Sequence, residues 1–322
     1  MQTVTLVGTE LTTSVMGFGC SSLLGDQTRA EGLELLAAAF DANIRYFDVA
    51  RVYGYGEAER LLGEFARGHR SQIVIATKFG IQPLVSLSRA AHLRAVVQKI
   101  MRFSPRLRTL LGRSARMAVK RSRFSVNEVR RSLETSLRAL GTDYIDIYLL
   151  HDCTVRDASE ELLVFLDQAR RDGKIRYFGV GTGVEQIVAI CGQHPQFAEV
   201  IQFQNSVLIS NLRYLGEPPG AVVTHGALAG SYTALKAHLS KNPELARRWS
   251  EIVQADCGNP SILAAMMLRH AVRANQRGPV LFHSRHAESI RGNARAIAEE
   301  WFAPEQLEQF ARLARDCGIR PS

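Results

Sequence analysis

Four side chains in the first half of the sequence are of types that transfer protons to and from a carbonyl group: Asp48, Tyr53, Lys78 and His151. Each lies at the end of a short apolar run or a few residues beyond it. A phenol is a weak acid, with a reference pKa of about 10, and a nearby ammonium lowers that value. We therefore expect Lys78 to lower the pKa of Tyr53 and Asp48 to hold Lys78 in place. His151 is the candidate donor of a hydrogen bond that orients the carbonyl oxygen.

Eight apolar segments have the length and composition of buried strands. They are residues 15–19, 44–48, 72–78, 144–150, 175–180, 200–204, 220–224 and 279–283. Helical patterns or long connections separate them, and buried strands that alternate with helices form parallel sheets. Eight such units in a chain of this length predict the α/β class and a (β/α)8 barrel. A doubly wound sheet is disfavoured because no GxGxxG motif follows an early strand.

The elements between the strands follow from the same patterns. Helical spacing predicts helices over residues 29–42, 57–66, 125–140, 159–172 and 184–192, and two closing helices over 287–300 and 304–317. Residues 3–7 and 11–12 predict an N-terminal β-hairpin. Ser125, with Glu128 three residues later, predicts a capping box. Because the carboxyl ends of barrel strands meet at one mouth, we expect Asp48, Lys78 and His151 to converge there.

The composition bounds the class of protein. The chain has 322 residues, of which 46% are hydrophobic, and this is enough for a single barrel domain over residues 1–322. No apolar run reaches the ~18 residues that a membrane span needs, and the N-terminus lacks the pattern of a signal peptide. The five cysteines are scattered and form no CxxC motif. We therefore expect reduced thiols, a cytoplasmic location and no membrane span.

The positive charge of the chain is concentrated in one segment. Residues 81–123 hold eleven lysines and arginines and no acidic residue, whereas the rest of the chain has 29 basic and 31 acidic residues. We interpret this segment as a basic insertion after the third barrel strand, with an apolar stripe formed by Leu93, Val96, Val97, Ile100 and Met101. It suits a lid over the barrel mouth, a surface for a partner, or a solvated loop. Its low aromatic content disfavours nucleic-acid binding.

Six sequence segments carry a resemblance to a known family. They read MGFGC, RYFDVARVYGYGEAERLLGE, IVIATKFG, SVNEVRRSLETSLRALGTDYIDIYLLHD, DGKIRYFGV and VIQFQNS. Together they resemble the aldo-keto reductases over nearly the whole chain. The resemblance implies NAD(P)H-dependent reduction of a small carbonyl compound, or oxidation of the corresponding alcohol or sugar. It implies that Tyr53 is the acid and base, that Lys78 and Asp48 tune it, and that His151 orients the substrate. The His151-Asp152 pair is similar to the sugar-dehydrogenase branches.

The resemblance also implies the cofactor site, with NADP(H) favoured and NAD(H) as the alternative. The positions it implies are Gly19, Thr182, Gln202, Asn205, Ser284, Arg285 and Asn293. Gln202, Ser284 and Asn293 match the family pattern. Thr182 stands where the family has a carboxamide-binding asparagine, and Asn205 stands where an aromatic residue stacks on the nicotinamide. Ser289 and Gly292 replace an arginine and a glutamate, which leaves Arg285 as the candidate partner of a 2′-phosphate.

Other functions remain as alternatives. Because of the departures in the cofactor positions, the chain is also consistent with a catalytically weak, nucleotide-binding regulatory subunit that docks a partner. A barrel hydrolase using Asp48 and Glu57 would leave Lys78 and His151 without a role. No metal is expected, because the three-residue spacing of His283 and His286 lacks a carboxylate or thiol partner. The oligomeric state is open.

Overall fold

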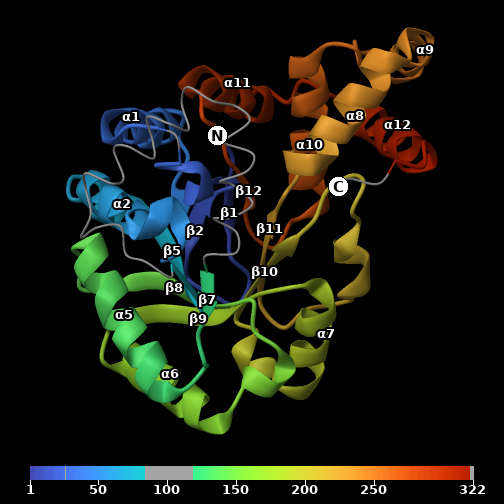
Figure 1. Cartoon of the computed structure of the whole chain (residues 1–322). Helices are drawn as coiled ribbons and strands as arrows, with labels where there is room; N and C mark the ends of the chain where they lie inside the picture. The colour runs from blue at the N-terminus through green and yellow to red at the C-terminus, as the bar shows by residue number, and fades with distance from the viewer. Residues whose placement is uncertain (26, 84–118, 320–322) are drawn as a thin grey trace.

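The eight predicted strands close into a parallel barrel. The computed structural model describes residues 1–25, 27–83 and 119–319. The barrel strands are β3 (Met16–Gly19), β4 (Tyr46–Asp48), β5 (Val74–Phe79), β8 (Ile145–His151), β9 (Ile175–Gly181), β10 (Val200–Gln204), β11 (Ala221–His225) and β12 (Val280–Phe282) (Figure 1). Neighbours in the barrel pair in parallel, and β12 pairs with β3 to close the ring. The predicted (β/α)8 fold is therefore confirmed.

Helices pack around the barrel, and most of them bury one apolar face against it. The predicted ones are α1 (Arg29–Asp41), α2 (Ala58–Ala66), α5 (Val126–Leu140), α6 (Glu160–Arg171), α7 (Val184–Gln193), α11 (Ala287–Ala298) and α12 (Pro304–Asp316). The capping box predicted at Ser125 was wrong. Ser125 does precede α5, but within the described ranges its side chain makes no cap hydrogen bond. A capping box forms instead at α1, between Thr28 and Glu31.

Three helices between β11 and β12 were missed, because residues 225–279 were interpreted as a long connection. They are α8 (Ala229–Lys241), α9 (Pro243–Val253) and α10 (Pro260–Ala274). With α12 they enclose a second hydrophobic core around Trp249 and Phe310, beside the barrel (Figure 1). Local start signals were present. Asn259 caps α10 by accepting hydrogen bonds from the first turn, and Pro260 occupies the first helical position.

The predicted hairpin closes the amino-terminal end of the barrel. Strands β1 (Thr3–Thr5) and β2 (Thr12–Ser14) pair in antiparallel fashion. Leu6 and Leu11, in the turn between them, are buried in one apolar cluster with barrel residues such as Ile147 and Leu149. A filled interior leaves the carboxyl ends of the strands as the place for a site.

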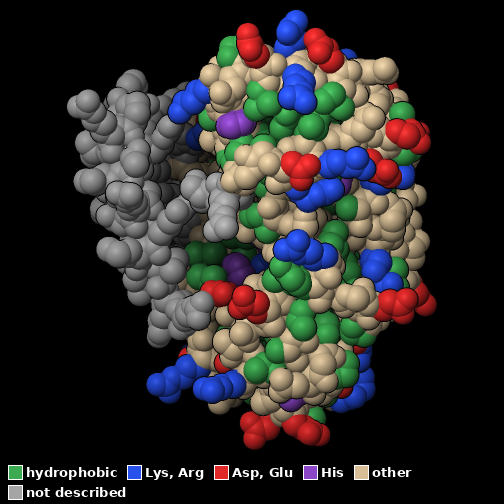
Figure 2. All heavy atoms as spheres, turned by 90° about the vertical axis from the view of Figure 1, so that its right-hand side faces the viewer, with side chains coloured by type: hydrophobic (Ala, Val, Ile, Leu, Met, Phe, Trp, Pro, Cys, Tyr) green, Lys and Arg blue, Asp and Glu red, His purple; other side chains and the backbone are tan. Residues whose placement is uncertain are grey.

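The basic segment is described only at its ends. Strands β6 (Ile81–Pro83) and β7 (Val119–Arg121) pair in antiparallel fashion directly after β5, so the segment leaves and re-enters the barrel at one point. The apolar stripe predicted within it lies outside the described residues. On the face shown in Figure 2, lysines and arginines are interspersed with acidic side chains, as the near balance of charge outside residues 81–123 leads one to expect. None of the described helices is long and apolar enough to cross a membrane.

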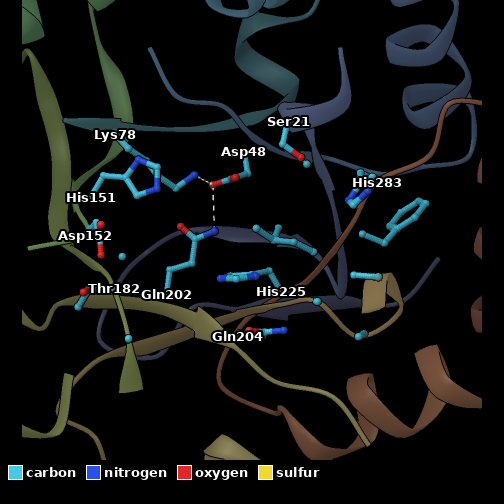
Figure 3. A pocket seen from close by; sticks show the side chains of 18 of the residues that line it. Ser21, Asp48, Lys78, His151, Asp152, Thr182, Gln202, Gln204, His225 and His283 are labelled. Atoms are coloured by element: carbon cyan, nitrogen blue, oxygen red, sulfur yellow. Dashed lines mark hydrogen bonds and ion pairs between the residues drawn. The ribbon is translucent and has the colours of Figure 1, made fainter. Parts of the chain in front are cut away.

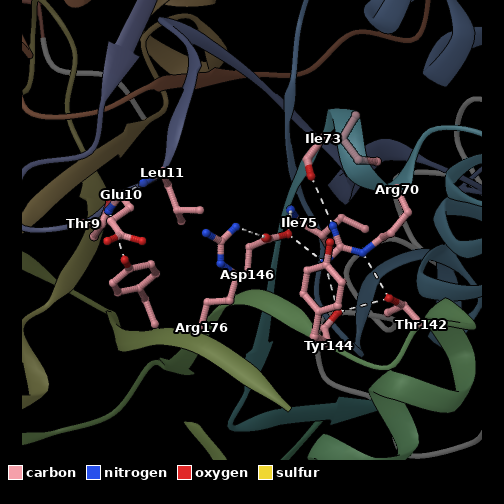
Figure 4. Close-up of polar contacts among 11 residues, drawn as sticks. Thr9, Glu10, Leu11, Arg70, Ile73, Ile75, Thr142, Tyr144, Asp146 and Arg176 are labelled. Atoms are coloured by element: carbon pink, nitrogen blue, oxygen red, sulfur yellow. Dashed lines mark hydrogen bonds and ion pairs between the residues drawn. The ribbon is translucent and has the colours of Figure 1, made fainter. Parts of the chain in front are cut away.

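A buried carboxylate ties the strands together near the bottom of the barrel (Figure 4). Asp146 on β8 is 1% exposed and accepts a hydrogen bond of 2.9 Å from the Ile75 backbone nitrogen on β5. It forms ion pairs of 2.8 Å with Arg70 and 3.2 Å with Arg176. The guanidinium of Arg70 also stacks on the Tyr144 ring, 3.8 Å from its centroid. Asp146 therefore joins β5, β8 and β9.

We expect Asp146→Asn to lower the free energy of unfolding by about 2 kcal/mol, because neutral asparagine loses the charge-assisted bonds to Arg70 and Arg176. Arg176 is 43% exposed, so solvent screens its share. Urea unfolding followed by circular dichroism measures the change. The control is Glu251→Gln, which removes an exposed ion pair of 3.8 Å with Arg247 and should cost less than about 0.5 kcal/mol. Equal losses for the two variants would contradict the role given to Asp146.

Candidate active site

A cavity of about 660 Å³ lies at the carboxyl ends of the barrel strands (Figure 3). The four side chains predicted to carry the chemistry, Asp48, Tyr53, Lys78 and His151, all line it. Asp48, Lys78 and His151 come from the ends of β4, β5 and β8, which are adjacent in the barrel. The register aligns Asp48 with Ala76 and Lys78 with Leu149. Parallel pairing thus brings together residues that are far apart in sequence.

Lys78 and Asp48 form a buried ion pair at the base of the cavity. Their side chains are 3% and 5% exposed, and the Lys78 ammonium donates directly to Asp48 Oδ1. It also donates to the backbone oxygen of Val49 at 3.4 Å. Burial acts to lower the pKa of Lys78, but the negative charge of Asp48 and the phenol of Tyr53 outweigh it, so the pKa is raised. The ammonium is therefore charged at neutral pH, as the predicted chemistry requires.

Tyr53 opens the 3₁₀ turn η2 (Tyr53–Gly56), which follows β4 and precedes α2. The turn is tight: Gly54 has a φ of +56°, and a Cβ there would lie 2.9 Å from the backbone oxygen of Leu23. The Lys78 ammonium lies 5.4 Å from the centroid of the Tyr53 ring. The His151 ring lies edge-on to the phenol, with 6.4 Å between the ring centroids. Tyr53 is thus next to both groups with which it was predicted to act.

The prediction that Lys78 brings the pKa of Tyr53 below its reference value was wrong in its net direction. Burial raises the pKa of Tyr53, and the nearby Lys78 ammonium offsets this only in part. The free-energy cost of burying a phenolate is larger than the stabilisation that the neighbouring ammonium provides. At neutral pH the Tyr53 hydroxyl therefore keeps its proton, which suits a group that donates it.

His151 is neutral at physiological pH. Burial, Lys78 and His225 together lower its pKa to about 3. A neutral imidazole carries one N–H donor and one acceptor nitrogen. Nδ1 is buried and has no hydrogen-bond partner within the described part of the chain. His151 can therefore offer a hydrogen bond to a carbonyl oxygen, and it does not add a second positive charge beside Lys78.

The predicted cofactor residues fall into two groups. Gly19, Thr182 and Gln202 line the cavity. Gln202 Nε2 donates to Asp48 Oδ1 at 3.1 Å, and its buried Oε1 has no hydrogen-bond partner among the described residues. The Thr182 hydroxyl donates to the Cys153 backbone oxygen at 2.9 Å, which leaves its oxygen able to accept. The cavity thus presents, beside the ion pair, an amide oxygen that can accept a hydrogen bond from a ligand.

The other four residues lie outside the cavity wall. The Asn205 side chain is buried and its Oδ1 accepts from the Leu212 backbone nitrogen at 3.1 Å, so it holds the following loop in place. The Ser284 hydroxyl donates to the His286 backbone oxygen at 3.1 Å. Arg285 and Asn293 belong to the segment after β12, and Arg285 lies close enough to the cavity-lining His283 to help burial lower the pKa of that imidazole.

Two further histidines face the cavity. His225, at the end of β11, lines the cavity. His283, directly after β12, also lines the cavity, and its place after a strand end was the signal that could have found it. Glu57, which the hydrolase alternative needs beside Asp48, does not line the cavity and lies 3.7 Å from the Arg60 guanidinium.

Comparisons with known proteins agree with this fold. A sequence model described as the Aldo/keto reductase family matches residues 15–214. Pyridoxal 4-dehydrogenase of Microbacterium luteolum is 31% identical over 195 residues, which are 56% of this chain and 55% of that protein. The chain spans about half the length of the curated relatives it matches.

Solved structures match over nearly the whole chain. The holo form of aldo-keto reductase AKR11C1 from Bacillus halodurans has a TM-score of 0.72 at 21% identity, covering 97% of this chain and 96% of that one. An aldo-keto reductase from Klebsiella pneumoniae in complex with NADPH has a TM-score of 0.68 at 20% identity, covering 98% and 96%. At such identities the structures indicate the fold, and the family model covers well over half of the sequence. The chain belongs to the aldo/keto reductase family.

Proposed function

We propose that this chain transfers a hydride between NADP(H) and a small carbonyl compound or the corresponding alcohol or sugar, with Tyr53 as the proton donor and acceptor. One observation carries the proposal: Tyr53 and His151 share a cavity with a buried ammonium, Lys78, that Asp48 holds in place. A protonated phenol, a fixed positive charge and a neutral imidazole are the groups that reduction of a carbonyl needs.

The roles of the four side chains follow from their charges. When bound, the nicotinamide supplies the hydride for reduction or accepts it in the reverse direction. As negative charge develops on the carbonyl oxygen, the Tyr53 hydroxyl gives that oxygen its proton, and the Lys78 ammonium stabilises the phenolate that remains. The neutral His151 donates a hydrogen bond that fixes the direction of the carbonyl. In oxidation the phenolate takes the proton back from the alcohol.

The residues around the cavity fit a nicotinamide dinucleotide. The buried Gln202 Oε1 can accept a hydrogen bond from the amide N–H₂ of a carboxamide, and the Thr182 oxygen can do the same. Leu228, the residue before α8, and Ala229, its first residue, line the cavity, and no side chain of the described residues caps that helix. An uncapped helix amino terminus stabilises a diphosphate. The NADPH complex of the Klebsiella pneumoniae relative supports this choice of cofactor.

Cofactor preference depends on Arg285 in this proposal. We expect Arg285→Ala to weaken NADPH binding by about 10- to 100-fold, because a charge-assisted bond to the 2′-phosphate is lost, and to leave NADH binding nearly unchanged. Titration of intrinsic fluorescence with each cofactor measures both constants. Arg291→Ala, an exposed arginine on α11, is the matched control. Equal affinity of the unaltered chain for NADPH and NADH would rule out a phosphate role for Arg285.

The test of the function itself is the oxidation of NADPH and NADH in the presence of a panel of aldehydes, ketones and sugars. The proposal expects turnover of at least one class of carbonyl compound. The alternative of a regulatory subunit expects cofactor binding without turnover. Tight binding combined with no activity on a broad panel, in both directions of the reaction, would favour the alternative.

A further inference from the structure

Gln202 occupies an unusual position for a side chain that also faces a ligand site. It is 3% exposed, and its amide nitrogen donates to the same Asp48 oxygen, Oδ1, that accepts from the Lys78 ammonium. Figure 3 shows the amide directed at Asp48 from the opposite strand wall of the cavity. The orientation of the amide is fixed by chemistry, because a flipped amide would set two acceptor oxygens against each other.

The surroundings leave little freedom to this amide. Gly181 on the neighbouring strand β9 faces it, and a Cβ at that position would lie 3.4 Å from Gln202 Oε1. The backbone oxygen of Gln202 accepts from the Thr182 nitrogen at 3.1 Å, which pins the strand itself. The close approach of Gly181 and the backbone bond to Thr182, both on the β9 side, therefore limit the movement of the Gln202 amide away from Asp48.

We propose that Gln202 is a positioning residue for the proton transfer: by donating to Asp48 it loosens the hold of Asp48 on Lys78 and so makes it easier for Tyr53 to give up its proton. The catalytic role of this proton rests on the proposed function, whereas the contact of Gln202 with Asp48 is observed. A second donor on Oδ1 shares the negative charge of the carboxylate. More of the positive potential of Lys78 is then left for the phenol.

The charged and titratable groups that face Tyr53 define what else acts on it. Lys78 on β5 favours the phenolate, whereas Asp48 on β4 and Cys20, in the turn after β3, disfavour it. The neutral ring of His151 on β8 lies edge-on to it. Gln202 is separate from these groups because it is uncharged and acts through Asp48. Substitution of Gln202 by a neutral residue therefore tests whether Gln202 acts on Tyr53 through Asp48, without removing a charge.

The experiment compares Gln202→Met, which keeps the size of the side chain and removes the donor, with Gln204→Met. Gln204 lies two residues later on the same strand, lines the same cavity and makes no hydrogen bond with Asp48 among the described residues. Ionisation of Tyr53 is read in the cofactor-free protein from ultraviolet absorbance of the phenolate. Each spectrum is corrected with the same variant carrying Tyr53→Phe, which cancels the other seven of the eight tyrosines. The reading is taken at an alkaline pH at which circular dichroism shows all variants folded.

We expect Gln202→Met to lower the fraction of Tyr53 ionised at that pH by about three- to tenfold, since loss of one neutral donor is worth a fraction of a charge pair. Gln202→Glu should lower it further, because a second carboxylate disfavours the phenolate, and it serves if the methionine variant folds poorly. Gln204→Met should leave the fraction unchanged. An unchanged fraction in both Gln202 variants, or an equal drop in Gln204→Met, would overturn the proposal.

Turnover separates this inference from the proposed function. If both hold, Gln202→Met lowers kcat for alcohol oxidation at one fixed pH by the same factor as the phenolate fraction, beyond any change in cofactor affinity. If the phenolate fraction falls and the unaltered chain oxidises no substrate, the link through Asp48 stands and the proposed function fails. If affinity for cofactor is the only property that changes, Gln202 only binds ligand and the positioning role is wrong.

Discussion

Tyr53→Phe is expected to lower kcat for carbonyl reduction by about 10²- to 10⁴-fold, the range that a positioned general acid contributes. Phenylalanine keeps the ring that packs beside Lys78 and His151, so the cavity keeps its shape and loses only the proton. The dissociation constant for NADPH should change little. Initial rates of NADPH oxidation with a saturating aldehyde, together with a fluorescence titration of NADPH, measure the two quantities.

The pH dependence of this loss gives an internal check. The pKa of His151 is about 3 and burial raises that of Tyr53, so neither group titrates between about pH 5 and 9. The deficit of Tyr53→Phe should therefore be the same across this range. Tyr55→Phe removes the other phenol of the same turn and should retain most of the activity. A large loss of activity in Tyr55→Phe with a small loss in Tyr53→Phe would show that Tyr55, and not Tyr53, is the acid.

The parts of the site that the sequence predicts are those fixed by strand ends. Asp48, Lys78 and His151 each terminate an apolar strand, and a closed parallel barrel brings such ends together whatever the loops do. Tyr53 could be placed because the glycines after it force a tight turn back toward the mouth. These inferences need only the period of the hydrophobic pattern and the closure of the sheet.

Residues whose position depends on loop conformation were predicted less well. Asn205, one residue beyond β10, turns its side chain to Leu212 instead of into the cavity, and only the path of the following loop decides that. The connection between β11 and β12 hides three helices, because their apolar faces meet one another and α12 in a separate core. The direction in which the pKa of Tyr53 is shifted depends on how deeply the phenol is buried, and no sequence pattern gives this burial.

Lys78→Met is expected to lower both stability and activity, because it leaves the Asp48 carboxylate buried without its cation. Removing one partner of a buried ion pair costs about 3–5 kcal/mol in the free energy of unfolding, or forces the carboxyl to take up a proton. Gln202 still donates to Asp48 and offsets part of this cost. Urea unfolding measures the stability. The rate of carbonyl reduction should fall strongly as well, since no positive charge remains to stabilise the phenolate of Tyr53.

The double variant Asp48→Asn/Lys78→Met separates the two effects. It contains no buried charge at this position, and a neutral asparagine can still accept from Gln202, so most of the lost stability should return. The activity should not return, because the positive charge beside Tyr53 is still missing. Recovery of both would mean that Lys78 serves only to neutralise Asp48. A Lys78→Met variant as stable as the unaltered chain would show that the ion pair contributes little to the free energy of unfolding. The proton chemistry would then be the reason that two charges are buried at the base of the cavity.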